Sequence, residues 1–210
     1  MKNTTNPHQM DLTARVAFAK VYPAIARHIT DKYNITQGHC LNAGSGPASL
    51  AIALAQITEL NIVSLDKQCN MTDIARTNIA EAGLSGRITT VTSEVCHTPF
   101  DDNYFDLIVS RGSVFFWENQ SDGLREMYRV LKPGGVIFCG GGMGSAAINR
   151  EATKIIMTDD RFKDMRQFWQ DRNCKRTEEN NSSFKHALTE AGINGNILLE
   201  CSGIWIEVIK

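Results

Sequence analysis

The sequence predicts an α/β fold built on a mostly parallel sheet, and three observations support this prediction. Short apolar segments with strand character alternate with segments whose apolar residues recur at the helical period. The segment 105–110 is apolar almost throughout, which is typical of a strand buried on both faces. Near the C-terminus, Ser202-Gly203 separates two apolar segments as a hairpin turn does, so one antiparallel strand is expected at the end of the sheet.

The elements follow in order from the N-terminus. Residues 1–10 are polar and expected to be loose, Asp11 is predicted to cap a first helix, and Pro23 is predicted to kink or restart it. Lys132-Pro-Gly-Gly135 is expected to end a helix. Strands are predicted at 39–43, 62–66, 88–94, 105–110, 136–139, 197–201 and 204–209, and helices at 48–56, 71–82, 124–131, 182–191 and within 143–180.

Composition and charge favour work on a small molecule. The chain has 210 residues, a hydrophobic fraction of 42% and a net charge of -1, so neither nucleic acid nor a membrane is an expected partner. Its six cysteines include no C-x-x-C pair and no zinc spacing, which favours small buried side chains in a reducing, cytoplasmic compartment and no metal site. No apolar run approaches the roughly 18 residues that would span a bilayer.

The stretch around Gly44-Ser-Gly46 predicts a ligand cradle. An apolar segment ends at these glycines and a helical pattern follows, so the order is strand, tight turn, helix. Glycines leave no Cβ over the turn, and the free N–H groups of the following helix favour a polar or anionic group beside it. Asp66, which lies 22 positions after Gly44 at the end of the next apolar run, is placed to accept hydrogen bonds from a ribose diol.

Other strand ends are expected to meet at the same edge of the sheet. Ligands of open parallel sheets bind beyond the carboxyl ends of the strands, where Gly44, Asp66, Glu94 and Ser110 would converge.

Taken together, these spaced motifs resemble the class I S-adenosylmethionine-dependent methyltransferase family. The matching stretches are Leu41-Asn-Ala-Gly-Ser-Gly-Pro47, Asp66 with Lys67 and Met71, Glu94-Val95, Thr98-Pro-Phe-Asp-Asp-Asn-Tyr-Phe-Asp106 and Arg129-Val-Leu-Lys-Pro-Gly-Gly135. The resemblance covers residues 36–140 strongly. It implies a Rossmann-like three-layer sandwich with a seven-stranded sheet, the cofactor S-adenosyl-L-methionine with its product S-adenosyl-L-homocysteine, and methyl transfer to a small-molecule acceptor.

The family's binding residues carry over by resemblance to matching positions. Gly44, Ser45 and Gly46 would meet the methionine portion through the backbone, and Asp66, next to Lys67, would hold the ribose hydroxyls. The remaining cofactor contacts would come from residues near the adenine and the sulfonium: Met71, Glu94, Val95, Ser110 and Arg111. Tyr22 could close over the cofactor or be a core aromatic.

Two positions depart from the family pattern. Asn42 stands where an acidic residue is usual, which weakens direct contact with the cofactor's amino group, and Ala48 stands where glycine is common.

The sequence does not identify the methyl acceptor, and it assigns no catalytic residue. Arg111 could anchor a substrate carboxylate or form a structural ion pair. Phe115-Phe-Trp117 could wall the acceptor pocket, contact the sulfonium or pack a helix. His28, His97 and Glu118 are possible general bases, although an amine, thiolate or stabilised carbanion needs none.

The length of the chain and the order of its predicted elements indicate the domain organisation. We expect one methyltransferase domain over 1–210, with residues 1–35 as a helical lid and residues 143–180 as a helical insertion near the acceptor, in a monomer or homodimer.

Three alternatives are kept. A nicotinamide dehydrogenase shares the first glycines and the acidic strand end, but Ser49 occupies the place of its third glycine. The others are a cyclase or lyase that uses the same cofactor, and a cofactor-binding protein that performs no chemistry.

Overall fold

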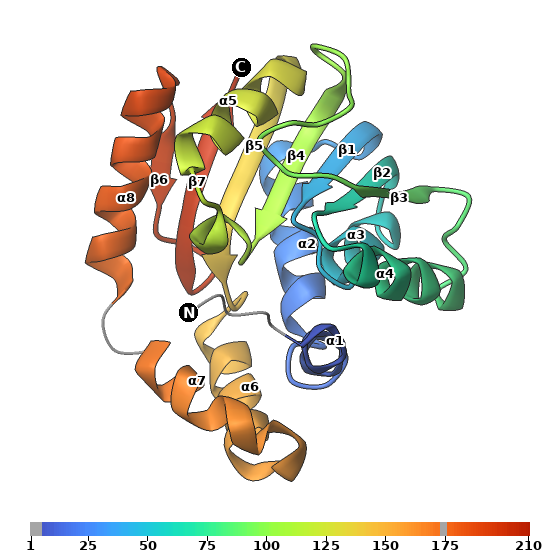
Figure 1. Ribbon diagram of the computed structural model, residues 1–210, viewed down its shortest axis with the longest axis vertical. Helices are drawn as coiled ribbons and strands as arrows, with labels where there is room; N and C mark the ends of the chain where they lie inside the picture. The colour runs from blue at the N-terminus through green and yellow to red at the C-terminus, as the bar shows by residue number, and fades with distance from the viewer. Residues whose placement is uncertain (1–5, 173–175) are drawn as a thin grey trace.

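The fold is a seven-stranded sheet with helices on both faces. A computed structural model describes residues 6–172 and 176–210, so that Cys174 lies outside the described residues. The strand order is β3-β2-β1-β4-β5-β7-β6 (Figure 1). The strands are β1 (Gln37–Ala43), β2 (Glu59–Asp66), β3 (Ile88–Thr92), β4 (Phe105–Arg111), β5 (Leu131–Gly142), β6 (Asn196–Leu198) and β7 (Gly203–Ile209).

Strand directions confirm the predicted sheet. β1, β2, β3, β4 and β5 pair in parallel, whereas β7 pairs antiparallel with both β5 and β6. The chain runs from β1 outward to β2 and β3 and then returns to β4 on the other side of β1. β1 and β4 therefore form the point at which the strand order reverses, the usual ligand-binding position in such sheets.

The helices complete three layers. α2, α3 and α4 pack on one face of the sheet, and α5 and α8 pack on the other. The helices are α1 (Pro7–Arg15), α2 (Val21–Tyr33), α3 (Ser49–Ala55), α4 (Cys69–Glu81), α5 (Gln120–Val130), α6 (Ala146–Thr158), α7 (Arg166–Arg172) and α8 (Arg176–Ala191), with 3-10 turns η1 (Val114–Phe116) and η2 (Asp160–Met165).

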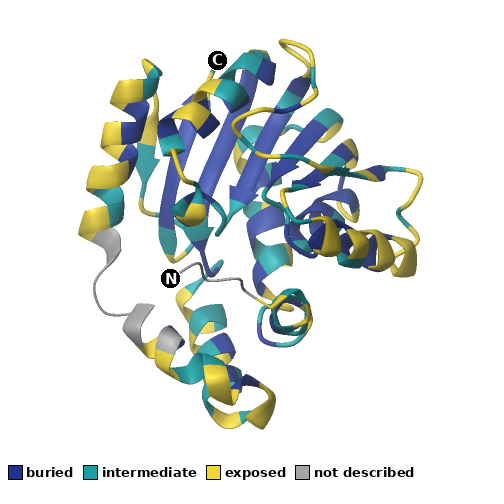
Figure 2. Ribbon diagram, in the orientation of Figure 1, coloured by how far each residue is buried: buried dark blue, intermediate teal, exposed yellow. Residues whose placement is uncertain are grey.

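Strand side chains alternate between two cores. In β1, Cys40 belongs to the core under α2 and α3, while Leu41 belongs to the core under α5 and α8. In β4, Leu107 and Ile108 divide in the same way. The strands are accordingly buried along most of their length, and the exposed residues lie on the outer faces of the helices (Figure 2).

The first helix begins earlier than the sequence predicted. Asn6, not Asp11, is the N-cap of α1, because its side-chain oxygen accepts the His8 N–H at 3.0 Å and Pro7 occupies the first helical position. Asp11 lies inside α1, where its Oδ1 accepts from the Asn78 side chain at 2.7 Å. Asn78 also donates to the Pro47 carbonyl at 2.9 Å and so ties α1 to α4 and to the glycine turn.

Several boundaries also differ from the prediction. β5 begins at Leu131, directly after α5, so that Lys132-Pro-Gly-Gly135 belongs to a strand edge whose pairing with β4 is irregular. α8 begins at Arg176, six residues before the predicted Ser182. β3 ends at Thr92 and leaves Glu94 in the following turn.

The N-terminal helices pack against the segment between β5 and α8. α1, α6 and α7 lie together beyond the carboxyl ends of the parallel strands (Figure 1). The Thr13 hydroxyl is 3.4 Å from the Met165 sulfur, and the Phe18 and Trp169 ring centroids are 5.5 Å apart. The lid role of residues 1–35 and the insertion over 143–180 stay predictions, and residues 1–5 and 173–175 lie outside the described ranges. Among the described helices, none has the length and apolar content needed to cross a bilayer.

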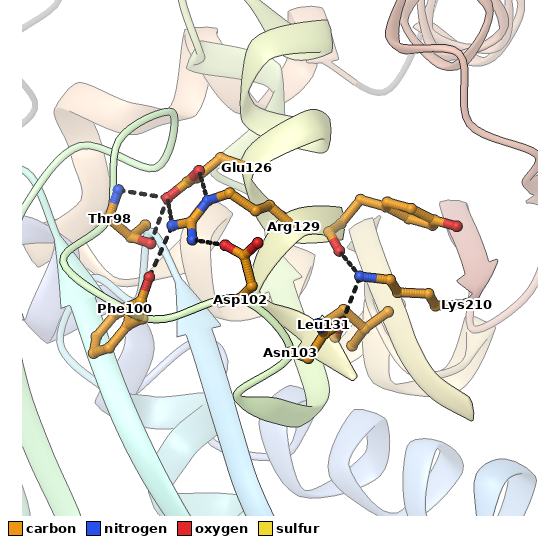
Figure 3. Close-up of polar contacts among 9 residues, drawn as sticks. Thr98, Phe100, Asp102, Asn103, Glu126, Arg129, Leu131 and Lys210 are labelled. Atoms are coloured by element: carbon orange, nitrogen blue, oxygen red, sulfur yellow. Dashed lines mark hydrogen bonds and ion pairs between the residues drawn. The ribbon is translucent and has the colours of Figure 1, made fainter. Parts of the chain in front are cut away.

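A polar network fixes the loop that enters β4. Glu126 accepts from the Thr98 N–H at 2.8 Å, from the Thr98 hydroxyl at 2.6 Å and from Arg129 at 2.7 Å, and Arg129 also pairs with Asp102 at 2.5 Å (Figure 3). Burial alone would raise the pKa of Glu126, but the hydrogen bonds from Arg129 and Thr98 outweigh it and lower this pKa to about 2. The network thus holds the 98–103 loop against α5.

We expect Glu126→Gln to reduce the free energy of unfolding by about 1–2 kcal/mol at neutral pH, because hydrogen bonds to a charged group are lost. The folded pKa of about 2 lies below the ordinary 4.5, so this stabilisation is complete above pH 4.5 and is lost as the pH falls toward 2. Urea unfolding at neutral pH and near pH 2 measures the loss of stability and its dependence on pH. Glu179→Gln, on the exposed surface of α8, is the control. A difference between Glu126→Gln and the wild type that does not shrink in acid would contradict the assignment.

Candidate functional site

The glycine turn joins β1 to α3 and is anchored to the end of β2. Gly44 and Gly46 have φ of 63° and 55°, a region that favours glycine. The Ser45 N–H donates to the Leu65 carbonyl at 2.8 Å, and the Gly46 N–H donates to Asp66 Oδ2 at 3.0 Å. The turn is therefore held in place by the strand that carries the predicted ribose-binding carboxylate.

Asp66 keeps acceptor capacity for a ligand. Its Oδ1 accepts the Gln68 N–H at 3.1 Å and its Oδ2 accepts the Gly46 N–H, whereas an ionised carboxylate offers about four acceptor positions. Burial raises the pKa of Asp66, although the Gln68 and Gly46 N–H groups and the charge of Lys67 act against the shift. This carboxylate is half-buried, oriented by backbone N–H groups, and retains acceptor capacity for a ligand.

Ser113 connects the end of β4 to the glycine turn. Its hydroxyl lies 2.7 Å from that of Ser110, donates to the Ala43 carbonyl at 3.1 Å, and accepts from Trp117 Nε1 at 3.2 Å. A Cβ on Gly44 would collide with the Ser113 side chain. Sequence reasoning missed this residue, because a serine two positions after a strand carries no signal of such contacts.

A cleft of about 1980 Å³ opens at this edge of the sheet. It brings together ten of the predicted cofactor-binding residues: Tyr22, Asn42, Gly44, Ser45, Gly46, Asp66, Lys67, Glu94, Val95 and Arg111. Met71 and Ser110 do not line it: Met71 is 1% exposed in α4, and Ser110 is fully buried against Ser113.

The β4 and β5 side of the cleft is largely apolar. Phe115, Phe116 and Trp117 line it, and they follow β4 in and after η1. Phe115 also stacks on Phe184 of α8 at 5.5 Å between centroids, so it has a packing role as well. Phe116 is 55% exposed. On the facing side, the insertion contributes Trp169.

The three candidate bases separate in space. Glu118 lines the cleft, whereas His28 and His97 are not among its lining residues. Instead, the His28 Nε2 lies 2.9 Å from a carboxylate oxygen of Glu200. Of these three candidates, Glu118 alone lines the cleft among the described residues.

Arg111 projects into the cleft from the end of β4. Its Nε donates to the Gly142 carbonyl at 3.1 Å, and its guanidinium carbon lies 4.7 Å from the Phe18 ring centroid and 5.1 Å from that of Tyr22. The structural ion pair that the sequence left open is not formed among the described residues, since no carboxylate lies within 4.0 Å of this guanidinium there.

Comparisons with known proteins agree with this geometry. The model of the methyltransferase domain family matches residues 41–139. A solved structure, described as a putative S-adenosyl-L-methionine-dependent methyltransferase from Methanococcus maripaludis, is 39% identical, with a TM-score of 0.87, and the match covers 97% of this chain and 91% of that one. The chain belongs to the class I S-adenosylmethionine-dependent methyltransferases. Their cofactor, S-adenosylmethionine, is the one that the sequence predicted.

More distant relatives share less of the chain. A ubiquinone/menaquinone biosynthesis C-methyltransferase of Geotalea daltonii is 34% identical over 92 residues, which are 44% of this methyltransferase and only 39% of that protein's length. The solved structure of a [4+2]-cyclase is 24% identical over 57% of this chain, with a TM-score of 0.54. That likeness shows the fold alone.

The two departures from the family pattern occupy informative places in this methyltransferase. Asn42 is 2% exposed, lines the cleft, and its Nδ2 has no hydrogen-bond partner among the described residues. Ala48 has φ of 66°, a left-handed conformation that is strained for a residue with a Cβ by roughly 1–2 kcal/mol. A glycine at this place would be free of that strain.

We expect Gly44→Ala to reduce the free energy of unfolding by about 2–4 kcal/mol, from left-handed strain and the collision with Ser113 together. Gly46→Ala is the matched control, because its φ is similar but its Cβ would meet only Met10 Cε at 3.6 Å. It should lose only about 1–2 kcal/mol. Urea unfolding of both variants measures how much more stability Gly44→Ala loses than Gly46→Ala. Adding Ser113→Gly to Gly44→Ala should recover most of this extra loss. Equal losses at the two glycines would show that Ser113 does not limit the turn.

Proposed function

We propose that this protein transfers the methyl group of S-adenosylmethionine to a small organic acceptor bound in the same cleft. The observation that carries the proposal is that the glycine turn, Asp66 and the aromatic segment after β4 all line one continuous cleft at the carboxyl ends of the strands. Binding at the point where strand order reverses is the general rule for open α/β sheets.

The cofactor would lie across the ends of β1, β2 and β3. In this proposal Gly44, Ser45 and Gly46 face the methionine portion, and Asp66 takes the ribose hydroxyls. Three features of the cleft suit that ligand. A Cβ at Gly46 would meet only the end of Met10 among the described residues, and Asp66 has unused acceptor positions. Asn42 lines the cleft and has a buried amide nitrogen without a hydrogen-bond partner in the part of the chain that the structure describes.

The adenine and sulfonium ends complete the proposed site. Glu94 and Val95 would contact the adenine, and Lys67 would lie beside the ribose. Met71 and Ser110 would act from beneath the cleft wall, since neither lines it. Tyr22 would cover the cofactor from α2.

Methyl transfer depends mainly on the positioning of the two reacting groups. The bound cofactor would supply an electrophilic methyl group, and the residues of the cleft would hold the acceptor atom beside it. Orientation of this kind can supply roughly 7–11 kcal/mol of the barrier. Phe115, Phe116 and Trp117 exclude water around the acceptor, and Glu118 is the side chain placed to take a proton when the acceptor is an alcohol.

The acceptor is proposed to be small, with an apolar body, because aromatic side chains wall the β4 and β5 half of the cleft. One relative is named for C-methylation in quinone biosynthesis, which supports a planar carbon acceptor as a narrower candidate. A cytoplasmic location and a monomeric or homodimeric state remain predictions of the sequence.

Product analysis tests the reaction class. Incubation with S-adenosylmethionine and a set of small acceptors should give S-adenosylhomocysteine together with a product heavier by one methylene, as seen by mass spectrometry. A rearranged product without that gain would identify the cyclase or lyase alternative. Binding of the cofactor with no product at all would identify the silent binder.

We expect Asp66→Ala to lower the affinity for S-adenosylmethionine by at least tenfold, because hydrogen bonds from the ribose to an ionised acceptor contribute roughly 1.5–3 kcal/mol each. Isothermal titration calorimetry measures the affinity. Asp73→Ala, which removes an exposed α4 carboxylate paired with Arg76, is the control and should bind normally. Because Asp66 also accepts from the Gly46 and Gln68 N–H groups, thermal melting must first show that the variant is folded. Unchanged affinity in a folded variant would show that Asp66 does not bind the ribose hydroxyls.

A further inference from the structure

We propose that Arg111 is the receptor for a carboxylate group of the acceptor, so that the substrate is a small organic acid with an apolar body. The inference rests on the proposed function, because it names the substrate class of that same cleft. The sequence left Arg111 open between the sulfonium end of the cofactor and a substrate carboxylate, and the proposal assigns it to the acceptor.

The Arg111 guanidinium is held in place but retains unused donors. Its Nε donates to the Gly142 carbonyl at 3.1 Å. One terminal nitrogen donates to the Met143 sulfur at 3.3 Å, and the other makes a long contact of 3.4 Å to the Tyr22 hydroxyl. Since the two terminal nitrogens carry four N–H groups, a pair of them can bind both oxygens of a carboxylate.

The electrostatic setting of Arg111 differs from that of the other arginines whose side chains the structure describes. Among those residues, seven arginines lie within 4.0 Å of a carboxylate: Arg15, Arg76, Arg87, Arg125, Arg129, Arg161 and Arg166. Arg27 and Arg150 have no such partner there, but both are exposed to solvent. Arg111 is half-buried, with aromatic rings near its guanidinium, and the part of the chain that the structure describes supplies no such partner. A charge removed from water without a counter-ion is unfavourable, so a ligand anion is favoured at this point.

Within the cleft, an anion has one suitable place. Lys67 and Arg111 are the only lysine and arginine that line the cleft among the described residues, and Lys67 adjoins the Asp66 carboxylate. The remaining charged lining residues are acidic: Asp66, Glu94, Glu118, Asp122, Asp164 and Glu178. An acidic ligand is therefore repelled from most of the cleft and attracted to Arg111.

The position of Arg111 favours the acceptor over the methionine portion of the cofactor as the source of the carboxylate. The glycine turn, Asp66 and Glu94 follow β1, β2 and β3, whereas Arg111 ends β4 and contacts Gly142 and Met143 at the end of β5. Phe18 and Tyr22 lie beside its guanidinium, and Trp169, which packs on Phe18, lines the same cleft. The carboxylate would thus be bound at Arg111 with the apolar body against those rings.

Binding of simple acids tests the proposal without knowledge of the true acceptor. Acetate, benzoate and phenylacetate, each compared with its neutral amide, are titrated into protein saturated with S-adenosylhomocysteine, and the fluorescence of Trp117 and Trp169 in the cleft wall reports binding. We expect at least one acid to bind tenfold or more tightly than its amide. Arg111→Met should abolish that preference, and Arg111→Lys should retain part of it. Arg76→Met, which removes an exposed arginine of α4 outside the cleft, is the control and should keep the preference.

Two outcomes would overturn the proposal. In the first, no acid of the set binds better than its amide, or Arg111→Met leaves the preference intact. In the second, Arg111→Met lowers the affinity for S-adenosylhomocysteine tenfold while 5′-methylthioadenosine, which lacks the carboxylate, binds unchanged, so that the guanidinium serves the cofactor. Thermal melting establishes that each variant is folded. A wild-type protein that binds the acids but neither S-adenosylmethionine nor S-adenosylhomocysteine would instead refute the proposed function and leave the anion site standing.

Discussion

The parallel pairing of β1 with β4 is the constraint on which the rest of the site depends. Cys40 lies opposite Leu107 and Asn42 lies opposite Val109, so the two strands end side by side while their connections lead away in opposite directions. The backbone leaves an open edge there, into which the turn after β1 and the segment after β4 both project. The Ser113 hydroxyl joins those two segments through the Ala43 carbonyl.

Packing at this junction explains why an unfavourable backbone is tolerated. Ala48 adopts a left-handed conformation at the start of α3, yet it is fully buried in the core under α2 and α3. Neighbouring hydrogen bonds hold Ala48 in this position. The Ala48 N–H donates to the Ser45 carbonyl, and the Asn78 side chain donates to the carbonyl of the preceding residue, Pro47. Local strain at a ligand site is compatible with folding when the surrounding structure outweighs it.

Some features were predictable because they depend on local pattern. The apolar runs that become β1, β2 and β4 could be recognised because they are buried in the core. Ser202-Gly203 correctly indicated a hairpin before β7, but β6 ends at Leu198 and Gly203 already belongs to β7, so the connecting loop is longer than predicted. The start of α1 was equally local, in Asn6-Pro7, but the polar composition of the first ten residues concealed it. The start of β5 at Leu131 was less accessible, since its irregular pairing requires the neighbouring strand β4.

The sequence by itself determined the α/β architecture, the glycine turn and the carboxylate at the end of β2, because periodicity and residue type are enough for these. Only the tertiary structure decided that Ser113 supports the turn, that Met71 and Ser110 lie beneath the cleft wall, and that Arg111 meets aromatic rings instead of a carboxylate among the described residues. Those facts depend on which side chains meet across distances of many residues. Such meetings are set by strand order and helix packing, and no local pattern of residues encodes them.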